Sequence, residues 1–227
     1  KIDSMIFNNV MLGDAFLSLS SNEDQDAYQL LFNTIDNGFM TSSVEGLISS
    51  ERENNLNLNA TFQSFPAAIL DQLIGNAIAD VQGQIDGSVS IDGKWSQPML
   101  QGELFLDAFE FSVPYLNVGY SLVVGSSVKV NSTSFSFEPT TLIDRLNSTS
   151  AFFDGTVSHQ NFKFFNLDMN FKSPNFLILN TDDSYDNNYY GKAFFNGNAR
   201  IHGPSQSLTF DLDGSSAEGT NLSLIHI

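Results

Sequence analysis

The stretch VQGQIDGSVSIDGKWSQPMLQGELFLD, residues 81–107, contains the pattern that decides the fold. Apolar and polar residues alternate in it at residues 88–92 and again at residues 103–107. A period of two residues is typical of β-strands, because successive side chains of a strand point to opposite faces of the sheet. Asp92-Gly93 stands between the two runs, and Asp-Gly pairs favour tight turns or bulges. The stretch therefore predicts neighbouring antiparallel strands.

The same alternation extends over most of the chain. It recurs at residues 15–20, 56–62, 133–137, 166–171 and 208–212. Asn-Gly or Asp-Gly pairs, such as Asn37-Gly38 and Asp154-Gly155, follow one another in the rhythm of an antiparallel meander. Where such a glycine lies inside an alternating run, we expect a bulge or sheet curvature rather than a hairpin end. The sequence predicts an all-β protein with an elongated, curved and mostly antiparallel sheet.

One segment departs from this period. Ser64 is suited to cap a helix, Pro66 falls in its first turn, and Gly83 follows its end. We therefore expect one short amphipathic helix at residues 64–82, between an N-terminal strand set at 1–63 and a main region at 83–227 of the same sheet. The helix is expected to pack on the sheet or to cover an apolar groove. The apolar residues at helical spacing are Leu70, Leu73, Ile74, Ala77, Ile78 and Val81.

Charge excludes several classes of partner. The chain of 227 residues has 9 Lys and Arg against 26 Asp and Glu, a formal net charge of −17, and it contains no Cys. Such a charge repels phosphate backbones and anionic lipid headgroups, so we expect no nucleic-acid partner and no electrostatic docking on membranes. Without Cys there is no disulfide framework, thiol catalysis or Cys-based zinc site.

Motifs of catalysis are also missing. His159, His202 and His226 are isolated, without the short spacing that metal sites use. No Gly-x-Ser-x-Gly elbow, phosphate-binding loop or dinucleotide fingerprint occurs in the chain. We expect no catalytic residue, no metal and no cofactor, although the spatial pairing of the many carboxylates is not readable from sequence.

The number of strands forces the sheet to bend. Sheets of more than about ten strands curl, split or close, which leaves a barrel, a sandwich or a curved gutter. Alternation places Leu104 and Leu106 on one face, with Phe105 and Phe109 expected on the other, and residues 176–179 repeat this pattern. Strands that are apolar on both faces need both faces covered. The cover can be protein, a membrane or lipid chains.

A series of motifs begins in the same stretch. Residues 109–114 (FEFSVP), 117–120 (NVGY) and 151–159 (AFFDGTVSH, with Phe162 after it) follow in order. This order resembles the TamB family of translocation and assembly module proteins (AsmA/TamB-like), in the form of its Bacteroidetes-type members. The resemblance covers residues 60–225 well and the first 60 weakly. It starts with a glycine-rich strand and a Gly…Pro-x-apolar-x-Gly motif made of Gly83, Gly87, Gly93, Pro98, Leu100 and Gly102.

The resemblance implies a fold and a role. Proteins of this family are expected to form a long curved sheet, a β-taco, with a continuous apolar groove. They are anchored in the inner membrane and cross the periplasm toward an Omp85-type outer-membrane partner, moving phospholipids and assisting outer-membrane protein assembly. The chain starts at Lys1 with no Met and no signal-peptide pattern. We therefore expect a C-terminal-region segment whose anchor lies elsewhere in a longer protein.

Alternation names the residues expected to line the groove. Each methylene of a lipid acyl chain that leaves water there contributes about 0.8 kcal/mol. The same side chains are equally able to pack on one another. The candidates are Ile85, Val89, Ile91, Leu104, Leu106, Tyr120, Leu122, Leu167, Met169 and Phe171.

Two other functions stay open from sequence. A cell-surface glycan-binding or adhesion domain would use exposed aromatics, with Trp95, Tyr189 and Tyr190 as candidates. A polysaccharide-active enzyme would use a pair of carboxylates as acid and base. For an open sheet of any function, unpaired edge strands predict dimers or aggregates of this chain.

Overall fold

The computed structural model describes residues 1–7, 9–21, 26–49, 55–71, 78–182 and 189–224. Within these ranges the protein is all-β, as the sequence predicts, and its fifteen strands form a single sheet. The strands are β1 (Ile2–Phe7), β2 (Val10–Ser21), β3 (Ala27–Asp36), β4 (Phe39–Ser49), β5 (Leu56–Pro66), β6 (Ala79–Lys94), β7 (Gln97–Val113), β8 (Val118–Leu122), β9 (Ser126–Asn131), β10 (Ser134–Asp144), β11 (Ser150–Gln160), β12 (Lys163–Thr181), β13 (Tyr189–Pro204), β14 (Thr209–Ser216) and β15 (Asn221–Leu224). In the described part of the chain, two short 3₁₀ helices, η1 (Ala67–Leu70) and η3 (Pro114–Leu116), follow β5 and β7.

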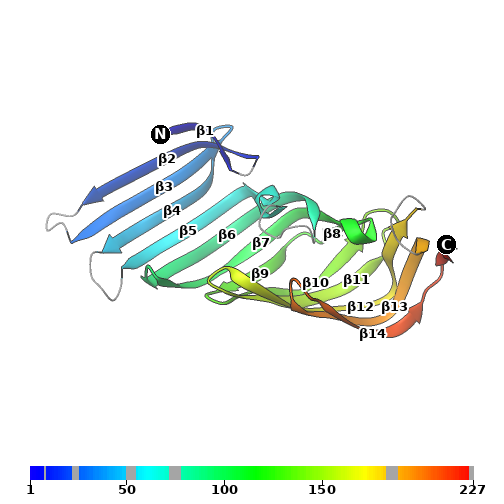
Figure 1. Ribbon diagram of the computed structural model, residues 1–227. Helices are drawn as coiled ribbons and strands as arrows, with labels where there is room; N and C mark the ends of the chain where they lie inside the picture. The colour runs from blue at the N-terminus through cyan, green and yellow to red at the C-terminus, as the bar shows by residue number, and fades with distance from the viewer. Residues whose placement is uncertain (8, 22–25, 50–54, 72–77, 183–188, 225–227) are drawn as a thin grey trace.

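The sheet is an antiparallel meander. Strands pair in chain order from β1 to β8, and again from β10 to β14. β8 and β9 both lie between β7 and β10, and β14 and β15 both pair with β13. Short turns such as Asn37-Gly38, both at positive φ, join neighbours because only antiparallel strands allow such tight connections. Figure 1 shows the result, an elongated, curved and twisted sheet with the two termini at opposite ends.

The structure does not show the amphipathic helix that the sequence predicts at residues 64–82. Ser64 and Pro66 belong to β5, η1 has four residues, and Ala79 already belongs to β6. Ser64 does not cap a helix: it has a φ of 50°, and its N–H donates to the Asp86 carboxylate at 2.9 Å. The β5–β6 pairing shifts register at this place, so Ser64 marks a bulge. Leu73, Ile74 and Ala77, which carry the helical spacing, lie outside the described residues.

Phe109 lies on the other face from the one expected. Ala108 has a φ of 46°, and the β6–β7 register shifts between the pairs Gln84–Asp107 and Gln82–Glu110. A bulge sets two residues against one, so the alternation of the strand reverses after it. Phe109 is therefore buried in the core, on the same face as Leu106.

The core lies on one face of the sheet, near η1 and η3. The Tyr120 ring of β8 stacks on Phe176 of β12 with centroids 5.3 Å apart, and its hydroxyl donates to the Leu177 carbonyl at 3.0 Å. β10 and β11 separate these two strands in the sheet order. The sheet therefore curls toward this face. Of residues 176–179, which are apolar on both faces, Phe176, Leu177 and Leu179 are buried and Ile178 is partly buried.

Candidate functional site

The candidate site is one face of the sheet, defined by which residues pair across strands. Directly paired residues of antiparallel strands point to the same face. One row of partners runs from β2 to β13 through Leu17, Phe32, Val44, Ala60, Val89, Gly102, Val130, Phe135, Val157, Leu167 and Gly203. The next row on this face contains Phe62, Gly87, Leu104, Val128, Phe137, Gly155, Met169, Ile201 and Phe210. We call these two rows the apolar rows; neither contains a charged residue.

The row between them points to the opposite face and differs completely in chemistry. A slip of one residue in the pairing would exchange the two faces, so the register itself keeps them distinct. We call this opposite side the polar face. Its row contains Ser43, Thr61, Ser88, Glu103, Lys129, Ser136, Thr156, Asp168, His202 and Thr209.

Glycines inside the apolar rows let neighbouring backbones approach closely. A Cβ on Gly102 would lie 2.1 Å from the Ser88 carbonyl oxygen, and a Cβ on Gly87 would lie 2.3 Å from the Glu103 oxygen. Larger side chains such as Phe62 and Leu104 stand on either side of Gly87 in its row. These glycines lie inside strands and not at hairpin ends, as the sequence predicts. The β6–β7 pairing is regular at both, so they mark close approach of the backbones rather than a bulge in this pair of strands.

All the predicted lining residues lie on this face, and the structure divides them between its two ends. The closed end, beside η1 and η3, holds four that belong to the packed core: Ile85, Leu106, Tyr120 and Leu122. The open end, toward the hairpin turns at residues 95–96, 132–133 and 161–162, holds three half-buried ones: Ile91, Leu167 and Met169. Val89 and Leu104 share the rows of Leu167 and Met169 but lie on β6 and β7, where Val89 is buried. Phe171 lies one row nearer the closed end.

Sequence reasoning missed where this face is most exposed. Leu17 and Leu19 of β2 are 66% and 57% exposed, and Phe210 and Leu212 of β14 are 60% and 63% exposed. Both pairs were readable as alternating strands, but only the pairing shows that they continue the face. Large uncovered apolar surface marks an interaction site. The apolar face is therefore uncovered near both edges of the sheet, at β2 and at β14.

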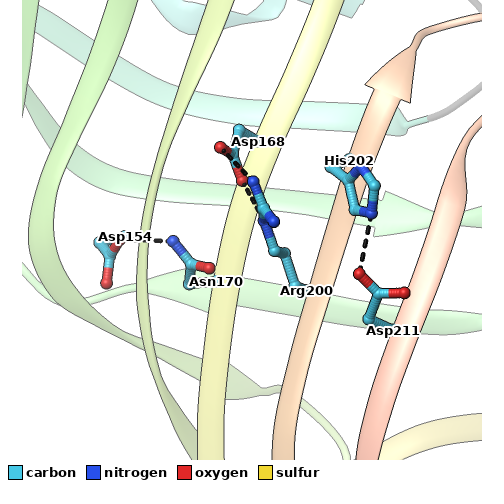
Figure 2. Close-up of polar contacts among 6 residues, drawn as sticks. All are labelled: Asp154, Asp168, Asn170, Arg200, His202 and Asp211. Carbon is cyan, nitrogen blue, oxygen red and sulfur yellow. Dashed lines mark hydrogen bonds and ion pairs between the residues drawn. The ribbon is translucent and has the colours of Figure 1, made fainter.

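The polar face carries hydrogen-bonded pairs of side chains over β11–β14, shown in Figure 2. Arg200 donates from Nε and Nη2 to the two Asp168 oxygens at 2.7 and 2.9 Å, and these bonds lower the pKa of Asp168. His202 Nε2 lies 2.8 Å from Asp211 Oδ2. A depression of about 490 Å³ lies over the same strands. It offers hydrogen bonds to a polar ligand, and within the described ranges no three carboxylates or imidazoles are placed to hold a metal ion.

His159 lies at the open end of the strands. The side chain is only 4% exposed, and its Nδ1 accepts the backbone N–H of Phe162 at 3.3 Å. The ring stacks on Phe162 at 4.6 Å and lies 5.2 Å from Phe135. Burial lowers the pKa of His159, because an apolar surrounding disfavours the imidazolium. No sequence pattern signals this burial, since His159 is isolated along the chain.

The aromatics proposed for glycan binding do not form a common site. Trp95 is 69% exposed at the β6–β7 turn, at the open end. Tyr190 is half-buried near the start of β13, at the other end of the strands, and the side chain of Tyr189 lies outside the described residues. An aromatic platform made by these residues is therefore not supported by their positions.

Comparison of the chain with protein-family models, with curated proteins and with solved structures finds no match. Among the described residues, no helix has the length and apolar character that crossing a bilayer requires. The functional argument therefore rests on the geometry of the two sheet faces.

Proposed function

We propose that the protein is a non-enzymatic, TamB-like cell-envelope biogenesis protein whose apolar face binds phospholipid acyl chains. The observation that supports this is the unbroken course of the first apolar row from β2 to β13 and of the second from β5 to β14. An acyl chain laid across the strands meets the same chemistry at each step of about 4.8 Å. No charged side chain in either row interrupts the path.

The energetics suit movement of a lipid better than fixed binding. Removing a methylene from water contributes about 0.8 kcal/mol wherever along the rows it happens, because the hydrophobic effect has no direction. A lipid displaced by one strand loses and gains equal contacts. The closed end, filled by Leu106 and Tyr120, then serves as a rigid floor, and the open end with Ile91, Leu167 and Met169 holds the tails.

The wider role is part of the same proposal and comes from the family resemblance. The protein would act in the periplasm as part of an inner-membrane-anchored chain, with an Omp85-type outer-membrane protein as partner. It would conduct phospholipids between the two membranes or assist outer-membrane protein assembly. The described strand β14 is exposed along its whole length, which fits contact with a further strand, including one from a second copy.

Site-specific photocrosslinking in cells tests the acyl-chain site. A photoreactive amino acid at Ile91 or Met169 should form phospholipid adducts, because both side chains lie on the apolar face near its open end. Ser90 and Asp168 are matched controls, since each is next to a test residue in sequence but points to the polar face. Equal labelling at Ser90 and Ile91, or adducts on the polar face alone, would refute the proposal.

A glycan-binding function is the second candidate, and the depression on the polar face favours it. Phe152, 69% exposed, lines this depression together with Asn170 and Arg200. Planar polar groups beside an exposed ring are able to bind sugar hydroxyls and stack on a sugar face. Titration with soluble glycans followed by NMR tests this function. Chemical-shift changes that Phe152→Ala abolishes would support it, and unchanged spectra would exclude it.

A further inference from the structure

The β11–β12 turn holds aromatic residues in an unfavourable backbone conformation. Asn161, Phe162 and Phe164 have φ values of 50°, 57° and 54°. A left-handed backbone is uncommon for bulky residues and costs free energy that the rest of the structure must offset. The same turn exposes Phe164 to 80% and Phe162 to 53%. Strain that displays apolar rings to solvent, rather than burying them, indicates a binding surface.

The β11–β12 turn is held in place by contacts with the buried His159. His159 stacks on the Phe162 ring and accepts its backbone N–H, and Phe135 and Phe165 border the imidazole at 5.2 and 5.9 Å. Such contacts fix the conformation of the turn. The exposed rings are therefore presented by a supported hairpin.

The β6–β7 turn presents a further exposed aromatic residue at the same end of the sheet. Lys94 pairs with Gln97, and the turn between them carries Trp95, the single Trp of the chain, 69% exposed. Lys163 closes the β11–β12 turn from its other side, where it pairs with Gln160. Both turns lie at the open end, where Ile91, Leu167 and Met169 are half-buried.

We infer that these two turns, residues 94–95 and 161–164, dock on the interfacial layer of a zwitterionic phospholipid bilayer. Trp is enriched at membrane–water interfaces, Phe inserts apolar surface there, and Lys side chains extend to the headgroups. The net charge of −17 opposes anionic lipid, so the attraction is apolar rather than electrostatic. This inference rests on the proposed acyl-chain site, to which it adds the place where lipid enters.

The single Trp makes the test direct. Phosphatidylcholine vesicles added to the protein should shift Trp95 fluorescence to shorter wavelength, and brominated phosphatidylcholine should quench it. The double variant Phe162→Ser/Phe164→Ser should lower the vesicle partition coefficient by about tenfold or more, since two phenyl rings no longer leave water. No spectral shift, or stronger partition into anionic than zwitterionic vesicles, would overturn the inference.

Phe39→Ser is the matched control for this test. Phe39 is 77% exposed beside the β3–β4 turn, at the closed end, and its replacement should leave partition unchanged. An equal loss in both variants would contradict docking through the open end. Thermal unfolding of each variant checks that the fold persists. Vesicle binding without adducts at Met169 would support docking through the turns and contradict the acyl-chain site. Adducts at Met169 without vesicle binding would support the acyl-chain site and contradict docking.

Discussion

The two ends of the apolar face share one sequence pattern but differ in structure. At the closed end, Leu106 and Tyr120 are 5% and 3% exposed and lie inside the packed core. At the open end, Ile91, Leu167 and Met169 alternate in the same way along their strands but remain half-buried. The difference arises from the curl that brings Tyr120 against β12. Alternation assigns a residue to a face, and distant contacts decide whether it becomes core or lining.

The largest expected effect separates core from lining by stability. Leu106→Ala should lower the free energy of unfolding by about 2–5 kcal/mol, because it opens a cavity in a packed core. Met169→Ala, at a half-buried position of the open end, should cost about 1 kcal/mol or less. Chemical denaturation measures both. Similar losses would mean that the open end is packed as core.

The next largest effect on stability is expected where two strands approach each other closely. Gly102→Ala places a Cβ against the Ser88 carbonyl oxygen, which belongs to the backbone and is not free to move away. We expect a loss of about 1–3 kcal/mol in unfolding free energy, typical of overpacking. Gly125→Ala, with a φ of 82° but open space around its Cβ, is a control for backbone conformation alone and should cost about 1 kcal/mol. A Gly102→Ala loss below about 1 kcal/mol would mean that the strands separate to admit the Cβ without a steric cost.

A smaller loss of stability is expected from a substitution that tests what holds the curl of the sheet in place. Tyr120→Phe keeps the stacking on Phe176 but removes the hydrogen bond to the Leu177 carbonyl. Leaving that buried acceptor unpaired should cost about 1–2 kcal/mol. Tyr115→Phe, at a position 65% exposed on η3, should change nothing measurable. An unaffected Tyr120→Phe protein would show that the curl does not depend on this bond.

Much of the fold was predictable from residues 81–107, because the period of two specifies both strand and face. The assignment of Phe109 failed because a bulge depends on the partner strand, which local sequence does not show. The prediction of a helix was wrong at both ends of the segment. At its start, β5 remains paired with β6 up to Pro66, and at its end β6 already pairs with β7 from Ala79. For the candidate site, sequence placed the lining residues on one face, but it had no means to divide them between closed and open ends.

The two ends should also respond differently to acid. Burial lowers the pKa of His159, at the open end, so the folded protein binds this proton less readily than the unfolded chain. The stability contributed there is complete above the ordinary value of 6.5 and decreases as the pH falls below it. At the closed end, desolvation would raise the pKa of Asp144, but hydrogen bonds from Thr149, Asn147 and Leu146 outweigh it and lower the pKa.

Mild acid should therefore loosen the open end first. The contribution of Asp144 is complete above its ordinary value of 3.8 and is lost only as the pH falls through its lowered pKa. Hydrogen exchange between pH 7 and 5, corrected for intrinsic rates, should show loss of protection at the Phe162 amide, which donates to His159, while the Thr149 amide, which donates to Asp144, stays protected. Parallel loss at both amides would mean that the two ends unfold as one unit, and His159→Phe should abolish the pH-dependent part of the Phe162 response.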